Sequence, residues 1–213
     1  MDTGVFLSDH KTAIIIGGGS SIKSLDFSLI EDHFPIIGVN DAFKLGKFVD
    51  YVWFGDERWF KGNGKEWGEG NRNLLKGYIE RRMVYTCAMS LVNDPDVFCY
   101  KRGLHVGIDT RSGYVAWNRS SGASAINFAY HLGARKILLI GFDMKRGTEG
   151  ETHWHNNYPT QDPDIDTLFL RYTDVFQYIK KDADRLGIEI YNLNPDSAIN
   201  DFPKITCKDV MLC

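Results

Sequence analysis

The chain has 213 residues, and its 43% hydrophobic and 25% charged content is typical of one globular domain with a sizeable core. The formal net charge of -3, without a conspicuous Lys/Arg run, argues against a nucleic-acid-binding surface. No apolar run approaches the roughly 20 residues of a membrane span, and the segment Met1–Thr12 is too acidic for a signal peptide. We therefore expect one domain over residues 1–213.

The cysteines indicate the cellular compartment in which we expect the protein. Their spacing matches no CxxC or other metal-ligand pattern, so we interpret them as reduced thiols in a reducing, cytoplasmic environment. The four cysteines are Cys87, Cys99, Cys207 and Cys213.

The first predicted element is a buried strand over Thr12–Ile16, because its apolar run is continuous, as in a parallel strand covered on both faces. The strand leads into the glycine–serine turn Gly17–Ser21, and we expect Ser20 or Ser21 to cap a helix that follows. Further strands are predicted over Pro35–Asn40, Asp50–Phe54, Met83–Cys87 and Val97–Tyr100.

The second half of the chain continues the alternation of helix and strand. A capped helix is predicted over Ser120–Gly133 and a buried strand over Lys136–Asp143. One long helix over Asp166–Leu186, closed by Gly187, precedes a last strand over Ile188–Pro195. The alternation predicts an α/β fold, a three-layer α/β/α Rossmann-like domain with a mainly parallel twisted sheet.

Two stretches, Lys61–Asn73 and Lys101–Arg119, are poor in predicted structure and are interpreted as surface loops. Trp59 and Trp67 are expected to be exposed near the first of them. Exposed tryptophans can indicate an interface, but the sequence leaves the oligomeric state open.

Ligands of an open α/β sheet bind at the carboxyl ends of its strands. Those ends read "GGGSS", "VND", "FGDE" and "GFD" in this sequence. Glycines let a backbone approach a ligand closely, and helix N-terminal amides suit a phosphate. The dinucleotide fingerprint is incomplete, because Ile22 stands at its third glycine, and no P-loop follows. A tight turn that holds no ligand therefore remains an alternative.

Two other segments extend the predicted nucleotide site. Asn40 and Asp41 lie roughly 20 residues after the glycines, where such folds often contact a ribose; the pair could equally cap a helix. The turn Asn118–Gly122 opens a second capped helix. Two helix starts at one sheet edge could hold both ends of a nucleotide.

The segment Glu151–Pro159, "ETHWHNNYP", carries the candidate catalytic groups. His153 and His155 can act as general acid or base, since the ordinary histidine pKa is near 6.5. Metal binding, with help from Asp162, Asp164 or Asp166, and a structural role are the alternatives. We expect the loop Met144–Pro163 to be a lid that closes over a nucleotide, with Trp154 pointing opposite to the histidines.

Taken together, these segments resemble the bacterial single-domain sialyltransferases, and a broader superfamily that includes archaeal 6-hydroxymethylpterin diphosphokinases. The resemblance runs from Thr12 to about Asn200. It is carried by the glycine–serine turn, "GVND", "SSGASAINFAYHLGARKILLIGFDM", the histidine loop and "IYNLNPDSAIND".

The resemblance implies a nucleotide site and a histidine general base without a required metal. The position that best matches the base is His155, and Asp143 matches an acid shared by both branches. The candidate catalytic residues are His155, His153, Tyr158 and Asp143. The candidate nucleotide-binding residues are Gly17, Gly18, Gly19, Ser20, Ser21, Asn40, Asp41, Asp56, Ser120, Ser121, Gly122, Asn194, Asp196 and Ser197.

Three functions follow as hypotheses. The first is a glycosyltransferase that uses a nucleotide-sugar donor, such as a CMP-sugar, and an acceptor hydroxyl, with no cofactor. The second is a diphosphotransferase that acts on a pterin-like alcohol, with Mg²⁺ held by Asp143 and neighbouring acids; its "TH" motif is satisfied by "THWH". The third is a nucleotide-binding protein without catalysis.

Overall fold

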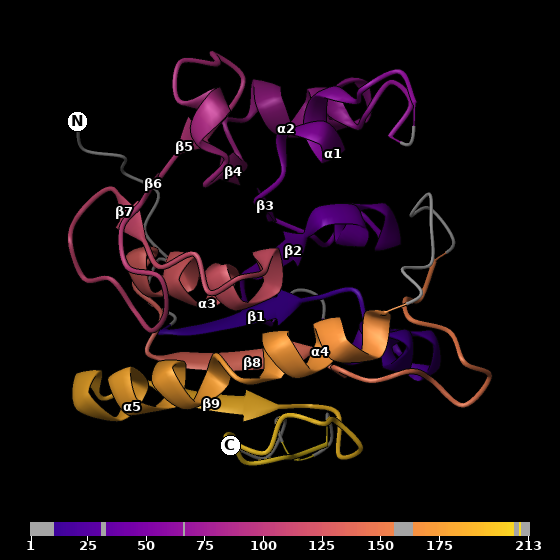
Figure 1. Ribbon diagram of the computed structural model, residues 1–213, viewed down its shortest axis with the longest axis vertical. Helices are drawn as coiled ribbons and strands as arrows, with labels where there is room; N and C mark the ends of the chain where they lie inside the picture. Colours follow the sequence, from indigo (N-terminus) through magenta and orange to yellow (C-terminus); the bar gives the residue numbers. More distant parts are fainter. Residues whose placement is uncertain (1–10, 31–32, 66, 156–163, 207–208, 210–213) are drawn as a thin grey trace.

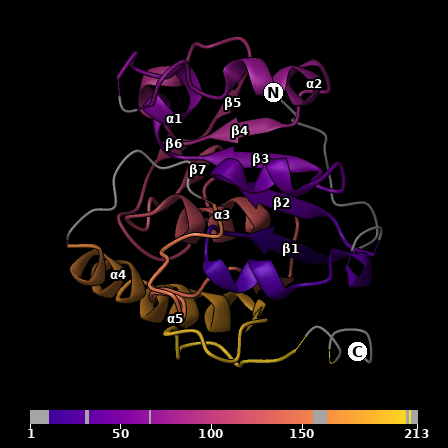
Figure 2. The same cartoon turned by 90° about the vertical axis from the view of Figure 1, so that its right-hand side faces the viewer.

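The computed structural model describes residues 11–30, 33–65, 67–155, 164–206 and 209. The main sheet is parallel and has seven strands in the order β5-β4-β3-β2-β1-β8-β9. Its strands are β1 (Thr12–Ile16), β2 (Ile36–Val39), β3 (Tyr51–Phe54), β4 (Val84–Thr86), β5 (Phe98–Cys99), β8 (Lys136–Ile140) and β9 (Glu189–Asn192). Figure 2 shows β4, β3, β2 and β1 stacked one above another.

The helices are short for an α/β protein. The α-helices are α1 (Glu57–Lys61), α2 (Lys76–Glu80), α3 (Ser121–His131), α4 (Ile165–Thr173) and α5 (Phe176–Leu186). The 3-10 helices are η1 (Ser20–Ser24), η2 (Phe27–Leu29), η3 (Asn40–Leu45), η4 (Arg72–Leu75) and η5 (Met89–Leu91). Figure 1 shows α3 and α5 running along the sheet.

Alternate residues of the strands face two separate hydrophobic cores, because successive side chains of a strand point to opposite faces. Ile15 and Trp53 belong to the core that includes residues of α3 and α5. Ile14 and Phe54 belong to the other core, which includes residues of η1, η3, α1 and η4. These two cores confirm the predicted three-layer α/β/α class.

The strand order reverses at β1, which pairs with β2 on one side and β8 on the other. The chain passes from β1 through β2, β3, β4 and β5 to one edge, and then returns to add β8 and β9 on the opposite side of β1. A ligand crevice is expected where the order reverses in such a sheet. The glycine turn follows β1 directly, so it lies at this point.

Two predicted helices differ from those found. The turn Gly17–Ser21 leads only into short 3-10 helices, and neither Ser20 nor Ser21 caps them: η1 has Gly19 as its N-cap, with no side-chain hydrogen bond, and η2 has Asp26, whose side chain accepts a bond from the Ser28 amide. The long predicted helix is interrupted, because α4 ends at Thr173 and α5 begins at Phe176. The sequence continues without Pro or Gly across this junction, so no local signal marks it.

Two predictions about loops and surfaces are wrong. The predicted loop Lys101–Arg119 contains a second, two-stranded parallel sheet, β6 (Lys101–Arg102) and β7 (Tyr114–Val115). Trp59 is 1% exposed rather than at the surface, since its indole packs between Phe43 and Phe54. The prediction of free thiols is confirmed for Cys87 and Cys99; the other two cysteines lie outside the described residues.

Close packing within the chain explains two glycines of the turn. A Cβ on Gly17 would lie 2.7 Å from the backbone oxygen of Gly141, and a Cβ on Gly19 would lie within the Asp143 carboxylate. Real Cβ atoms essentially never approach other atoms this closely. The turn therefore has a structural reason for its glycines even before any ligand is considered.

We predict that Gly17→Ala lowers the free energy of unfolding by about 1–3 kcal/mol, the usual cost of overpacking a site that cannot yield. The matched control is Gly77→Ala, because Gly77 lies in α2 with no atom within 4 Å of an added Cβ. That change should stabilise the protein by about 0.5–1 kcal/mol through helix propensity. Urea unfolding of both variants measures this, and equal stabilities would contradict the packing argument.

Candidate active-site cleft

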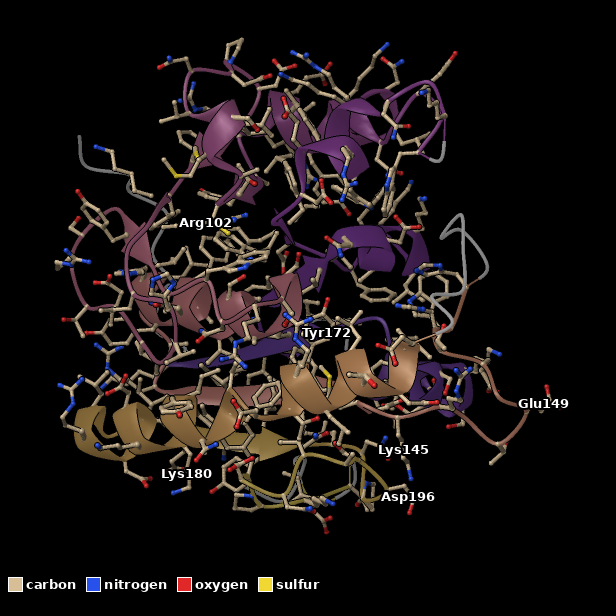
Figure 3. The ribbon with its side chains drawn as sticks, viewed as in Figure 1. Arg102, Lys145, Glu149, Tyr172, Lys180 and Asp196 are labelled. Carbon is tan, nitrogen blue, oxygen red and sulfur yellow. The ribbon has the colours of Figure 1, made fainter. Side chains whose placement is uncertain are left out.

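A cleft of about 1190 Å³ opens at the carboxyl ends of the strands. Its walls come from segments far apart in sequence: the glycine turn, the ends of β2, β3 and β8, the start of α3, the segment after β8, and α4. Figure 3 places Arg102 on the β6 side of α3 and Tyr172 on α4, and both residues line this cleft. Its position matches the crevice expected from the strand order.

The carboxylate of Asp143 joins three segments below the cleft. Its Oδ2 accepts a hydrogen bond from the Ser21 amide at 2.8 Å, and its Oδ1 accepts one from the Ser21 hydroxyl at 2.6 Å. Oδ1 also accepts a bond from Asn194 Nδ2 at 2.8 Å. Asp143 is 4% exposed. The turn after β1, the end of β8 and the turn after β9 are thus fixed to one another.

The two histidines of the predicted loop line the cleft together. The rings of His153 and His155 stack with centroids 5.7 Å apart. His153 Nδ1 lies 2.9 Å from the Thr152 hydroxyl, and its ring rests against Gly18, where a Cβ would approach it to 3.1 Å. Gly18 therefore leaves room for a histidine of this chain.

Burial lowers the pKa of both histidines. The pKa of His153 falls to about 4, because of desolvation and then repulsion by His155. The pKa of His155 is also lowered, by burial, although the negative charge of Asp41 opposes this. Both rings are therefore neutral near pH 7, the state in which an imidazole can accept a proton.

Asp41 lies behind His155 rather than in the cleft. Its carboxylate is 3% exposed and accepts hydrogen bonds from Trp59 Nε1 at 2.8 Å and Lys44 Nζ at 3.0 Å. Its Oδ2 lies 3.8 Å from His155 Nε2, and the side chain of His155 is 6% exposed. A buried carboxylate at this distance favours the protonated imidazole.

Trp154 does not point directly away from both histidines, as alternation along an extended segment would predict: residues 152–155 bend, and the Trp154 ring meets the His155 ring edge-on with centroids 4.7 Å apart. It packs against the core that holds the 3-10 helices and is absent from the residues that line the cleft, whereas His153 and His155 line it. Its backbone amide donates to the Gly18 carbonyl at 3.1 Å. The tryptophan thus anchors this segment to the glycine turn.

The start of α3 forms the opposite wall. Ser120 is the N-cap, and its hydroxyl accepts a hydrogen bond from the Ala123 amide at 3.2 Å. Ser121 and Gly122 follow it in the cleft wall. This 11-residue helix presents its positive dipole end and its first amides toward the cleft, which favours a negatively charged ligand.

The structure divides the sequence-predicted residues into two groups. Those that line the cleft are Gly17, Gly18, Gly19, Asn40, Asp56, Ser120, Ser121, Gly122, Asp143, His153 and His155. Those that do not are Ser20, Ser21, Asp41, Asn194, Asp196 and Ser197. Four of the second group line a smaller cavity on the other side of Asp143, namely Ser20, Ser21, Asn194 and Asp196. Tyr158 lies outside the described residues, as do residues 156–163 of the predicted lid.

Asp56 and Ser197 illustrate the two groups. Asp56 caps α1 through the Arg58 amide and also holds the Arg58 guanidinium. Burial alone would raise the pKa of its carboxyl, but the hydrogen bonds from Arg58 bring that pKa below its usual value. Ser197 is buried and donates to the Phe142 carbonyl at 2.6 Å.

Sequence reasoning missed the residues that complete the cleft. Arg58 directly follows the strand end "FGDE", and Arg102 and Trp117 lie in a stretch interpreted as a loop. The apolar wall from α4 was also missed, although its spacing of three and four residues is visible in the sequence. That wall consists of Ile165, Leu168, Phe169 and Tyr172.

The diphosphotransferase hypothesis requires a Mg²⁺ site. The side chains of the cleft, as the structure places them, do not fit such a site. Mg²⁺ takes several oxygen ligands at once, whereas the Asp143 carboxylate accepts three hydrogen bonds from the chain and so serves mainly to join its segments. Within the described residues, no group of three or more His, Cys, Asp or Glu side chains is placed to hold a metal ion. We therefore derive no step through Mg²⁺.

Comparisons with known proteins show the fold. No protein-family model matches the sequence, and no curated protein matches it. The chain is similar to the solved structure of the sialyltransferase CstII from Campylobacter jejuni in complex with cytidine-5'-monophosphate, with 17% identity, a TM-score of 0.55, and coverage of 93% of this chain and 86% of that one. Monofunctional alpha-2,3-sialyltransferase Cst-I from the same organism gives 17% identity and a TM-score of 0.52, over 96% and 84% of the two chains.

A third solved structure, the sialyltransferase CST-II in complex with a trisaccharide acceptor and CMP, matches with 17% identity and a TM-score of 0.50, over 90% of this chain and 84% of that one. These likenesses establish a sialyltransferase-like fold. Among the helices that the structure describes, none has the length and apolar character to cross a membrane.

We predict that Asp143→Ala lowers the free energy of unfolding by about 2–4 kcal/mol, because a buried charged acceptor is removed and its donors lose their partner. Asp196→Ala, an exposed carboxylate in the same neighbourhood, should change stability by less than about 0.5 kcal/mol. Chemical unfolding of the two variants beside the wild type measures the difference. A loss below 1 kcal/mol for Asp143→Ala would show that the three segments hold together without it.

We also predict a pH-dependent stability from His153. Its pKa is about 4 in the folded chain and 6.5 as its unperturbed value, so the unfolded chain binds the proton first as the pH falls. Protonation of this histidine therefore leaves the free energy of unfolding nearly unchanged above pH 6.5. It lowers the free energy of unfolding as the pH falls toward 4, by about 2 kcal/mol between pH 7 and pH 5. Urea unfolding at both pH values should show a smaller change for His153→Gln than for the wild type. An identical pH dependence would contradict this assignment.

Proposed function

We propose that the protein is a glycosyltransferase that moves a sugar from a nucleotide-activated donor, a CMP-sugar, to an acceptor hydroxyl. The observation that carries the proposal is the meeting of two neutral histidines with the N-terminus of α3 across one cleft. The sialyltransferase-like fold, seen in solved structures that hold CMP and a trisaccharide acceptor, supports the same reaction class.

The nucleotide phosphate would bind between the glycine turn and the start of α3. The backbone of Gly18 and the amides after Ser120 line facing parts of the cleft. Helix N-terminal amides stabilise negative charge, and charge grows on the phosphate as the bond to the sugar breaks. These groups would therefore favour the departure of the nucleotide monophosphate.

His155 would act as the general base. It would take the proton of the acceptor hydroxyl while that oxygen bonds to the anomeric carbon, and the bond from this carbon to the phosphate oxygen would break. His153, with a pKa of about 4, is a weaker base near neutral pH. His155 has Asp41 at 3.8 Å from Nε2 to stabilise the imidazolium that forms. Asp41 would thus position and support the base instead of contacting a ribose.

The segment after β8 would close the donor away from water. Its residues 144, 145 and 151–153 line the cleft, and Trp154 joins it to the core. Water competes with the acceptor for an activated sugar, so a covered site would protect the donor. Closure over a bound nucleotide stays a prediction of the sequence.

His155→Ala should reduce turnover by about 10²–10⁴-fold, the usual contribution of a general base, while CMP binding changes less than about twofold. His153→Ala, at the neighbouring ring, should retain more activity because that ring is the weaker base. Steady-state rates with a CMP-sugar and calorimetric binding of CMP measure the two properties. Full turnover by His155→Ala would remove this histidine from the mechanism.

A thermal-shift screen with and without Mg²⁺ separates the three hypotheses, because a ligand that binds the folded state raises the apparent stability. Stabilisation by CMP without metal supports sugar transfer. Stabilisation by ATP only with Mg²⁺ would contradict it in favour of diphosphate transfer. Nucleotide binding without turnover across a broad panel of donors and acceptors would contradict catalysis altogether.

A further inference from the structure

Asp41 and Lys44 form an ion pair on one side of the 3-10 helix η3, which follows β2 directly. A 3-10 helix has three residues per turn, so side chains three positions apart lie one above the other. The Lys44 ammonium therefore meets the Asp41 carboxylate, with Nζ 3.0 Å from Oδ2. The side chain of Asp41 is 3% exposed and that of Lys44 is 28% exposed. The carboxylate is thus buried, and the ammonium reaches it from the edge of the solvent.

The two oxygens of Asp41 face different groups. Oδ1 accepts a hydrogen bond from Trp59 Nε1 at 2.8 Å, and the buried indole fixes the orientation of the carboxylate. Oδ2 binds the ammonium and also lies 3.8 Å from His155 Nε2. The ammonium and the imidazole therefore approach the same oxygen. Their nitrogens lie within about 7 Å of each other, the most that distances of 3.0 and 3.8 Å allow.

This arrangement opposes protonation of His155. A buried carboxylate beside an imidazole favours the imidazolium, and a protonated ring cannot accept a proton. The Lys44 ammonium balances the charge of Asp41 and repels a second cation at the same oxygen. The pKa of His155 is lowered most by burial, raised by Asp41, and lowered again by Lys44. The adjoining ring of His153, whose pKa is about 4, is neutral near pH 7 and adds no charge.

We propose that Lys44 is a positioning residue for the base: its ammonium occupies the Asp41 oxygen that faces His155, and so keeps His155 unprotonated until an acceptor hydroxyl binds. When the ring takes the hydroxyl proton, the imidazolium shares that oxygen with the ammonium, which solvent can reach. Lys44 is not among the residues that line the cleft, so it acts through Asp41. The proposal rests on the proposed function for the role of His155 as the base.

Nuclear magnetic resonance of the full-length protein tests the proposal without any substrate. The imidazole ¹H–¹⁵N signals of His155, assigned by their loss in His155→Gln, report the midpoint of its protonation. Lys44→Gln keeps a polar side chain but removes the charge, so we expect that midpoint to rise by about one pH unit. Lys44→Arg keeps the charge and should restore the wild-type midpoint. An unchanged midpoint in Lys44→Gln would overturn the proposal.

The matched control is Lys180→Gln. Lys180 also pairs with an aspartate one helical turn away, Asp184, and its side chain is 40% exposed. It stands on α5 (Figure 3), which packs on the opposite face of the sheet from η3. Exposed charges separated by more than about 8 Å are largely screened at physiological salt, so the His155 midpoint should not move. Equal rises in the two variants would reflect net charge alone and would overturn the specific role of Lys44.

A measurement on the wild type decides the question even if Lys44→Gln does not fold. The ¹³Cε signal of Lys44, assigned by its loss in Lys44→Arg, should shift at the midpoint of His155, because both groups approach one carboxylate oxygen. The ¹³Cε signal of Lys180 should stay constant through the same titration. A Lys44 signal that does not respond to protonation of His155 would overturn the proposal.

The pH dependence of kcat/KM with a CMP-sugar then separates this proposal from the proposed function. Lys44→Gln should move the acidic limb of the profile to higher pH by as much as it moves the His155 midpoint, with the rate recovering where the ring is again neutral. An equal loss of rate at every pH, with an unmoved midpoint, would mark Lys44 as merely structural and overturn its role. A wild type without turnover would contradict sugar transfer, whereas the resonance midpoints would still decide whether Lys44 controls the charge of His155.

Discussion

Much of this structure depends on the acceptor hydrogen bonds of one buried carboxylate. Asp143 stands where β8 ends, and it binds Ser21 beyond β1 and Asn194 beyond β9. Because charged acceptors form stronger hydrogen bonds than neutral ones, this group fixes three adjacent strand ends to one another. Gly19 has no side chain, and only that absence gives the carboxylate room. The floor of the cleft is thus set by packing inside the chain.

A rigid floor allows the two histidines to be buried yet accessible. Trp154 enters the core beside the glycine turn, and the rings on either side of it are turned to the cleft. Desolvation then keeps both rings neutral, whereas Asp41 behind His155 favours its protonated form. Opposed effects of this kind bring the pKa of a general base close to the pH at which it acts. Arg102 differs from the histidines, because it is a cation whose partners in two hydrogen bonds are uncharged backbone carbonyls.

The chemical groups that line the cleft differ from one end to the other. Near the switch between β1 and β8 it offers backbone amides, a helix terminus and neutral imidazoles. Toward β4 and β6 it offers the Arg102 guanidinium, which two backbone carbonyls hold over an indole face. The first set suits a leaving phosphate and a proton transfer, and the second suits recognition of a charged substituent.

The sequence by itself determined the fold class and the edge of the sheet that carries the site. Continuous apolar runs such as Thr12–Ile16 predict buried parallel strands, and the polar residues after them converge because parallel strands end at one edge. It did not reveal that Asp41 is turned inward or that Asp143 is already occupied by Ser21, because the direction and partners of a side chain depend on residues distant in sequence. It also missed Arg102, whose two carbonyl partners come from the ends of other strands. Only the tertiary structure decided these points, since burial and pairing are properties of the assembled sheet rather than of any local segment.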